Sequence, residues 1–333
     1  MKITGKNIAL IFFIVLIVGC QKEDTAVILP APGDMSNSIA TMGPNYLNQV
    51  YFDFGTGKQH TVDYRIYDLA FESSANGFRI YLNTGKLMFV CHTGETNFNA
   101  ADTSGKQWRT DSNQLDDDST AIGDWKSNGE VIVIDRGRAE NYGVERWRKL
   151  KVISVDANSY NIEYQTYNSS VIHQFQLIKD PDYSLVYFSF DNDGQQVSVS
   201  PKKDSWDIVF TKFTHTYYDE PITSPFKYYL VTGAILNKWN NELNTSVKKD
   251  STIGYKPFVD VIASDINSYP LSAGATIIGF DWKYFDFNLG YIIYPDRFYL
   301  LKDELGFYYK IRFLDFYDST GNKGSATFEY QRL

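Results

Sequence analysis

Six short segments from the first half of the chain recur in the same order in the second half. The matched pairs are 50–54 with 186–190, 67–71 with 206–210, 125–126 with 282–283, 135–136 with 296–297, 149–153 with 310–314, and 162–165 with 328–331. Ordered self-similarity indicates a duplicated structural unit. We therefore expect a first β repeat over 46–180 and a second over 181–333. The longer insertions of the second repeat, around 212–280, are where we expect binding loops.

Both repeats consist mainly of short runs in which apolar and polar residues alternate. Clear examples are 50–54, 131–134, 149–155, 184–190 and 308–316. Alternation with a period of two is typical of half-buried strands, and aromatic residues, 16% of this chain, also favour strands. Turn sequences such as Asn192-Asp193-Gly194 separate the runs and favour hairpins. The sequence thus predicts a mostly β chain with two tandem antiparallel domains of β-sandwich type.

The first 20 residues have the pattern of a bacterial lipoprotein signal. Lys2 and Lys6 precede an apolar stretch over 8–18 that is shorter than the ~20 residues of a membrane-spanning helix. A charged start and a short apolar core are typical of a secretory signal. The segment Ile17-Val18-Gly19-Cys20 resembles the lipobox, in which the cysteine becomes the acylated N-terminus. We expect a signal peptide over 1–19, lipidation at Cys20, and an anchor in the outer membrane.

The residues after the cysteine suggest an export signal followed by a spacer. Gln21, Lys22, Glu23 and Asp24 look like the surface-export signal of lipoproteins from relatives of Bacteroides, although a charged linker would have a similar composition. Prolines and small polar residues follow. We therefore expect residues 20–45 to be a lipidated cysteine with a flexible tether, and the folded part to be exposed on the cell surface.

Charge and residue content exclude several classes of function. The net charge of −8 argues against nucleic acid as a partner, because phosphate binding needs a basic face. Once Cys20 is lipidated, Cys91 is the only thiol, so we expect neither a disulfide nor a cysteine-rich metal site. The four histidines lack the spacing of known metal motifs, and no nucleophile elbow or P-loop occurs. We expect no catalytic residues, no metal site and no enzymatic activity.

The second repeat resembles the HmuY family of outer-membrane lipoproteins. The resemblance rests on the strand 206–210, on Trp282-Lys283-Tyr284-Phe285, and on the terminal pair 309–316 and 323–330. It covers most of 184–333, and the first repeat shares it only through its similarity to the second. The resemblance implies an HmuY-like antiparallel β fold and, in the family, capture of haem at the outer membrane.

The ligands of the haem-binding members are not matched here. Those members hold iron between two histidines, and some relatives are thought to use methionine. Beyond His215 this chain has no His, Met or Cys, and an approximate alignment places Phe287 at one ligand position. The other ligand would fall within 254–279, which contains no imidazole or thioether. Since haem iron needs an axial His, Met, Cys or Tyr, we expect no cofactor, with tyrosine ligation as the remaining route to haem.

Four residues are our candidates for lining a ligand. They are His215, Tyr217, Tyr218 and Tyr284. His215 follows the strand 206–210 and precedes Tyr217 and Tyr218, and Tyr284 lies in the segment 282–285 that carries part of the resemblance. Two functions remain open. One is a non-enzymatic surface binding module that passes its ligand to a transporter. The other is an accessory structural subunit of an outer-membrane complex, such as a SusC/SusD-like transporter or a secretion or barrel-assembly machine. In both cases an outer-membrane barrel protein or other lipoproteins are the expected partners.

Overall fold

The computed structural model describes residues 32–239, 245–248, 256–269 and 274–333. The predicted signal peptide, Cys20 and the export residues Gln21 to Asp24 lie outside this range. Residues 32–333 form one compact unit. In the described part of the chain no helix is long and apolar enough to cross a membrane.

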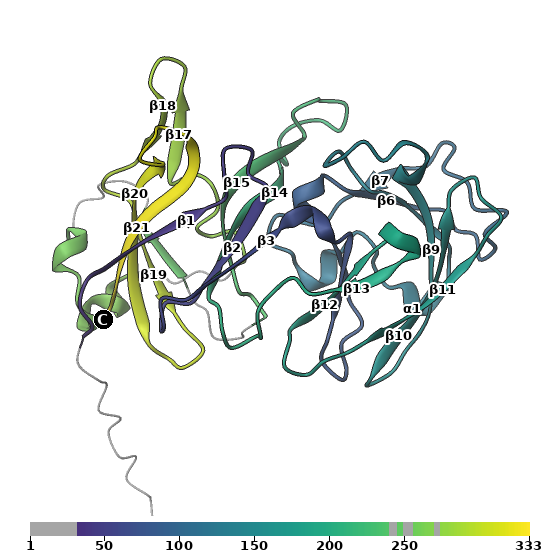
Figure 1. Cartoon of the computed structure of the whole chain (residues 1–333), viewed down its shortest axis with the longest axis horizontal. Coiled ribbons are helices and arrows are strands. Elements are labelled where there is room, and N and C mark those ends of the chain that lie inside the picture. The colour runs from purple at the N-terminus through teal and green to yellow at the C-terminus, as the bar shows by residue number, and fades with distance from the viewer. Residues whose placement is uncertain (1–31, 240–244, 249–255, 270–273) are drawn as a thin grey trace, which may run out of the picture. The chain divides into compact units, whose positions relative to one another are not determined.

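Short antiparallel strands make up most of this unit (Figure 1). In the first half they are β1 (Ser36–Thr41), β2 (Asn48–Phe52), β3 (Gln59–Asp63), β4 (Leu69–Glu72), β5 (Ile80–Leu82), β6 (Phe89–His92), β7 (Trp108–Arg109), β8 (Ile132–Asp135), β9 (Trp147–Val155), β10 (Ser159–Thr166) and β11 (His173–Ile178). In the second half they are β12 (Leu185–Ser189), β13 (Gln195–Val197), β14 (Ile208–Thr216), β15 (Tyr228–Leu236), β16 (Thr245–Lys248), β17 (Lys283–Asp286), β18 (Gly290–Ile293), β19 (Phe298–Lys302), β20 (Tyr308–Tyr317) and β21 (Lys323–Arg332).

Helical structure in the described residues is limited to short segments of three to six residues. They are η1 (Tyr64–Ile66), η2 (Thr84–Lys86), η3 (Asp117–Ser119), α1 (Trp125–Asn128), η4 (Gly143–Arg146), η5 (Asp191–Asp193), η6 (Phe258–Asp260) and η7 (Ala263–Ser268). The predicted mostly antiparallel β class is therefore confirmed.

The strands form four larger sheets and one small one. Their orders are β11-β10-β9-β8-β6-β7, β13-β12-β4-β5, β15-β14-β2-β3, β1-β21-β20-β19-β16, and the hairpin β17-β18. One apolar core lies between the first and second of these sheets, and another between the third and fourth. A further core joins the second sheet to the third. The two four-stranded sheets are thus covered on both faces.

Burial on both faces corrects the expectation of half-buried strands. Every residue of β12 is buried. Val186 and Phe188 point into the first core, whereas Leu185 and Tyr187 point into the joining core. Continuous apolar strands are typical of sheets that lie between two layers.

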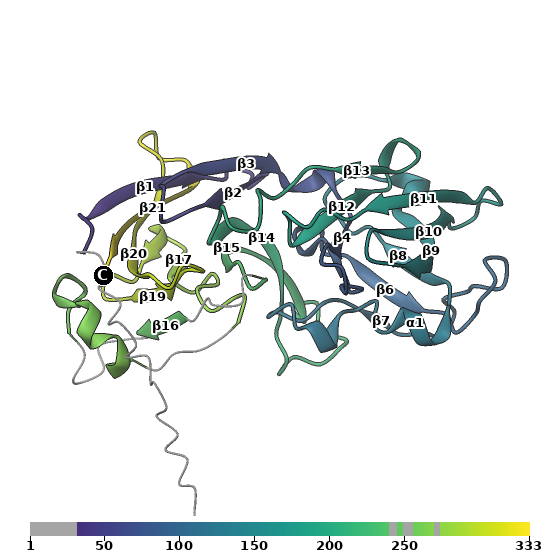
Figure 2. The same ribbon diagram turned by 90° about the horizontal axis from the view of Figure 1, so that it is seen from below.

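The sheets combine strands from both repeats. Hairpin β2–β3 pairs through β2 with β14 of the second repeat, and hairpin β12–β13 pairs through β12 with β4 of the first. The early strands β1 to β3 lie beside the late strands β14 and β21 in both views (Figures 1 and 2). The boundaries 46–180 and 181–333 therefore describe the sequence repeat, whereas one folded core uses 69–197 and the other uses 36–63 with 208–332.

Two equivalent joints hold the exchanged hairpins. In one, the N–H of Asp68 donates to the carbonyl of Phe188 (2.8 Å) and the N–H of Phe190 donates to Oδ2 of Asp68 (2.8 Å). In the other, Asp207 bonds the carbonyl of Phe52 (2.8 Å) and the N–H of Phe54 (2.7 Å) in the same way. These residues are partners in the sequence repeat, so the exchange is reciprocal.

The predicted tether is too long. Residues 36–41, which we assigned to it, form β1 and pair with β21 from Ser36↔Tyr330 to Thr41↔Ser325. Two things draw this segment into the fold: the free edge of β21, and the second core, where Ala40 is completely buried.

Candidate functional site

Hairpin β14–β15 extends beyond its sheet. β2 pairs only with Ile208 to Phe210, so the rest of β14 pairs only with β15. The first repeat holds the far end of β14 through Asn113. Its Nδ2 donates to the carbonyl of Thr216 (3.0 Å), and its Oδ1 accepts from the N–H of Thr216 (2.6 Å). The projecting end of the hairpin is therefore fixed in place.

The side-chain amide of Asn113 also determines the tautomer of His215. Asn113 Nδ2 also lies 3.2 Å from Nδ1 of His215, and the two bonds to Thr216 fix which end of the amide faces the ring. Nδ1 therefore accepts, and the proton of the neutral imidazole lies on Nε2. Burial lowers the pKa of His215, against a smaller opposing effect of Asp281. His215 is thus a neutral ring that can donate through Nε2.

Only part of the predicted ligand-lining set lies together. The ring centroid of His215 lies 4.6 Å from that of Tyr217 and 5.0 Å from that of Phe280. Tyr218 follows at the hairpin tip and is 66% exposed, with Nζ of Lys227 5.8 Å from its ring centroid. Tyr284 lies on another hairpin, where its ring packs 5.0 Å from that of Tyr294.

That other hairpin, β17–β18, presents a strongly apolar surface. Phe285 is 54% exposed, Phe287 95% and Leu289 73%. In Figure 1 the hairpins β17–β18 and β14–β15 project from the same side of the sheets. The sequence analysis missed these residues as a surface, although their alternation in a turn-containing segment was a usable signal.

The base of β17–β18 is anchored beside β15. The ring of Trp282 is completely buried and stacks 4.0 Å from Phe313. Lys283 donates from Nζ to the carbonyl of Thr232 (2.6 Å), and its Nζ lies 4.5 Å from the ring centroid of Phe316. Burial lowers the pKa of Lys283 to about 7.

We refer below to the exposed apolar residues of the two hairpins as the hairpin surface; they are Tyr218, Ile222, Phe226, Tyr229, Tyr284, Phe285, Phe287 and Leu289.

Comparison with known proteins shows that part of the chain is similar to one protein family. The sequence model described as HmuY protein matches residues 182–330. The second half of the chain is HmuY-like. The match begins just before β12, so it includes the hairpin β12–β13 that completes the other core. No curated protein matches the chain.

Solved structures of HmuY-type proteins are also similar to this chain. Apo PinO from Porphyromonas gingivitis is 12% identical, with 90% of this chain and 97% of that chain covered and a TM-score of 0.32. The apo HmuY analogue from Tannerella forsythia is 11% identical, with the same coverages and a TM-score of 0.30. Scores of this size carry no argument about function.

Several residues of the described chain that could in principle ligate haem iron are already engaged or buried. On β14, the Nε2 of His215 carries the proton and offers no lone pair. His92 uses Nδ1 toward Glu130 and Nε2 toward the carbonyl of Ala121. Met42, Met88 and Cys91 are completely buried within the two halves. No group of three or more His, Cys, Asp or Glu in the described part of the chain could hold a metal ion.

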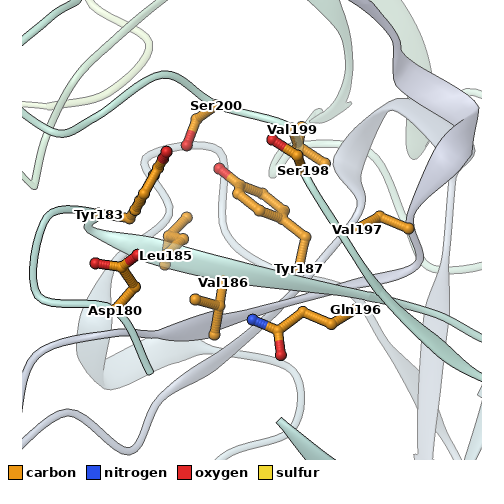
Figure 3. Close-up of a pocket in the computed structure, with 10 residues that line it drawn as sticks. All are labelled: Asp180, Tyr183, Leu185, Val186, Tyr187, Gln196, Val197, Ser198, Val199 and Ser200. Atoms are coloured by element: carbon orange, nitrogen blue, oxygen red, sulfur yellow. The ribbon is translucent and has the colours of Figure 1, made fainter. Parts of the chain in front are cut away.

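Two cavities lie away from the predicted residues. One of about 270 Å³ opens between β12 and residues 196–200, with Tyr183 and Tyr187 on its wall (Figure 3). Beside it, the Gln196 amide bonds the N–H and the carbonyl of Ile178 (3.0 and 2.9 Å). A larger polar cavity of about 1000 Å³ is lined in part by Glu72, Lys238 and Trp239. None of His215, Tyr217, Tyr218 or Tyr284 lines either cavity.

Proposed function

We propose that this HmuY-like chain is a non-enzymatic binding module whose ligand or partner docks on the hairpin surface. The observation that carries the proposal is the exposure of large apolar side chains on two rigidly based hairpins. Phe287 and Leu289 lie on one hairpin, and Ile222 and Phe226 on the other. Large apolar side chains gathered on exposed hairpins are expensive to expose and typically mark an interaction site.

The proposed location is the outer surface of the outer membrane. The lipobox at Cys20 and the export-like Gln21 to Asp24 support anchoring and export. Residues up to about 35 would then separate the anchor from the first strand. Multiple acyl chains hold a protein durably at a membrane, since each buried methylene contributes ~0.8 kcal/mol.

The ligand is proposed to bind without coordination of iron. His215 would serve as a hydrogen-bond donor next to Tyr217 and Phe280. Haem and metal-free protoporphyrin titrated into the purified chain should therefore behave alike, and His215→Ala should not alter the absorption band of added haem. A haem band characteristic of histidine ligation that disappears in His215→Ala would contradict this assignment.

An affinity pull-down tests the interaction itself. The chain is tagged after Leu333, membranes are solubilised in mild detergent, and co-purifying proteins are identified. Recovery of a stoichiometric barrel protein or lipoprotein should fall at least tenfold in the double variant Phe287→Ser, Leu289→Ser. Val144→Ser is the matched control, because Val144 is 79% exposed but lies on η4 in the other core's half. Equal recovery by all three proteins would overturn the hairpin surface as the docking site.

A stoichiometric partner would also support the second candidate, an accessory subunit of an outer-membrane complex. The observation that favours this candidate is the joining core, which fuses the two repeats into one body. A rigid body with two projecting hairpins suits a permanent subunit as well as a carrier. Release of the partner by a competing small ligand would separate the two, since only the carrier has a ligand to exchange.

A further inference from the structure

The outer edge of β15 is only partly covered. Ala234 bonds Gly279 in both directions (2.9 and 3.0 Å), and Leu236 donates to the carbonyl of Ala275 (2.7 Å). Thr232 accepts from Lys283 on the same side (2.6 Å). These contacts cover the half of β15 that lies nearest the core.

The other half of the edge, from Tyr228 to Leu230, is open. The N–H of Tyr217 donates to the carbonyl of Lys227, so odd-numbered residues of β15 face β14 in the antiparallel register. The backbone groups of Tyr228 and Leu230 therefore point away from β14. Within the described part of the chain they have no hydrogen-bond partner.

This edge lacks the usual protection of an exposed strand. Natural edges are blunted by proline, by charged side chains or by a bulge. Residues 228–231 read Tyr-Tyr-Leu-Val, and β15 pairs with β14 without a register shift. Lys227, which directly precedes the strand, is turned away, because its Nζ bonds the carbonyls of Tyr218 and Glu220.

We propose that an extended peptide segment of a partner protein adds to β15 as a further strand, bonding the backbone of Tyr228 and Leu230. This inference deepens the proposed function, since it assigns the kind of partner that the hairpin surface takes. An edge of unpaired N–H and C=O groups is complementary to another extended backbone, and a planar small molecule cannot satisfy it.

The side chains around the edge define the peptide further. Tyr229, Phe226 and the neighbouring hairpin β17–β18 are apolar and exposed, so alternate residues of the peptide should be apolar. Asp219 and Glu220 lie in the turn that precedes β15, and the chain carries a net charge of −8. The peptide should accordingly be neutral or basic.

Selection from a phage-displayed library of random dodecapeptides tests the proposal. The purified chain without its signal peptide is the target, and selected peptides are measured by fluorescence anisotropy. We expect alternating apolar residues in the selected peptides. N-methylation of either the odd-numbered or the even-numbered peptide amides, but not of both sets, should weaken binding about tenfold or more. The reason is that only every second amide of an added strand donates to the edge. The amides of Tyr228 and Leu230 should exchange hydrogen more slowly in the complex.

A proline pair supplies the matched variants. Leu230→Pro removes an N–H that β14 does not use, so the fold should be retained while peptide binding falls about tenfold. Thr61→Pro places the same change on β3, the opposite edge of that sheet, and should leave binding unchanged. Circular dichroism and thermal melting verify that both variants fold.

Three outcomes would overturn strand addition: selected peptides that bind Leu230→Pro as tightly as the parent, affinity that is independent of the N-methylation phase, or a dimer of the chain that Leu230→Pro dissociates. The last would make a second copy the occupant. If Phe287→Ser with Leu289→Ser abolishes partner recovery but Leu230→Pro does not, the proposed function stands and strand addition fails.

Discussion

The exchange of hairpins predicts what happens when the chain is cut at the repeat boundary. A fragment of residues 181–333 keeps the strands of the second core from β14 onward but loses β1 to β3. Four large side chains that are buried in this core go with them: Met42, Val50, Phe52 and Phe54. Burial of each contributes about 1.5–3 kcal/mol, or about 6–12 kcal/mol together. A domain is typically stable by only about 5–15 kcal/mol, so we expect this fragment not to fold cooperatively.

Urea unfolding followed by tryptophan fluorescence measures the effect. The fragment contains Trp206 and Trp282, which are both buried in the intact chain. Addition of a peptide of residues 32–63 should restore a cooperative transition, and the same peptide with Phe52→Ala and Phe54→Ala should not. A fragment of residues 64–200 contains all the strands of the other core and should fold alone.

One result would refute this reasoning. If 181–333 unfolds cooperatively at the same urea concentration with and without the peptide, its own hairpin β12–β13 has replaced β2–β3. That replacement is chemically reasonable, because Phe188 and Phe190 match Phe52 and Phe54 in the sequence repeat. The observed exchange would then contribute nothing that a contiguous repeat could not supply.

Three substitutions test the joints between the repeats. Burial, and then the nearby Glu304, Asp53 and Asp303, raise the pKa of Asp207 to about 8 although the Phe54 N–H opposes them. Its folded-state pKa exceeds the unfolded value of about 3.9. The contribution of Asp207 to the free energy of unfolding is therefore complete below pH ~4 and is lost as pH rises toward 8, by up to ~1.4 kcal/mol per pH unit. Asp207→Asn should flatten this slope in urea titrations at pH 5 and 8, and an unchanged slope would show that Asp207 is not its source. Asp68→Asn should cost about 3–5 kcal/mol, because it leaves Lys86 buried without its paired carboxylate and leaves Arg136 with Asp191 alone; a melting temperature within a degree of the parent would contradict this. Gly194→Ala should cost about 1–3 kcal/mol more than Gly321→Ala in chemical denaturation. Both glycines have similar positive φ (90° and 83°), but only at Gly194 would a Cβ meet the Tyr164 hydroxyl, at 2.0 Å. Equal losses of stability in the two variants would mean that the Tyr164 side chain moves to make room.

Local pattern predicted the strands but not their partners. Residues 50–54 and 186–190 have nearly the same sequence of apolar and aromatic residues, so either hairpin is suited to either Asp joint. The strand β1 was missed for a related reason: its Ser-Asn-Ser start is polar, and it is stabilised by pairing with the distant β21.

The sequence predicted that His215 and Tyr217 lie close together but not the hydrogen bonds around them. His215 and Tyr217 are adjacent in sequence and lie together, as strand geometry dictates. The proton on Nε2 depends on Asn113, which is 102 residues away, and no local signal reveals such a contact. The exposure of Phe287 was overlooked, although its place in the turn between two alternating segments was a usable signal.

The charge pattern of the two joints indicates how the repeats have diverged. In the first repeat, the completely buried carboxylate of Asp68 is bonded by Lys86 and by Arg136 (2.9 Å each). Despite the opposing effect of burial, these cations keep the pKa of Asp68 below its usual value. Arg136 also pairs with Asp191 (2.7 Å), so this joint is held by a network of ion pairs.

The second repeat has redirected the matching arginine. Arg297 corresponds to Arg136 in the repeat, but its guanidinium bonds the carbonyl of Asp281 and lies 3.3 Å from Oδ2 of the same residue. Asp281 immediately precedes Trp282 and Lys283, the base of hairpin β17–β18. The cation that pairs with the buried carboxylate in one copy therefore braces the projecting hairpin in the other, and burial raises the pKa of Asp207 to about 8. Under the proposed function, the first repeat would act as a scaffold while the second presents the hairpin surface.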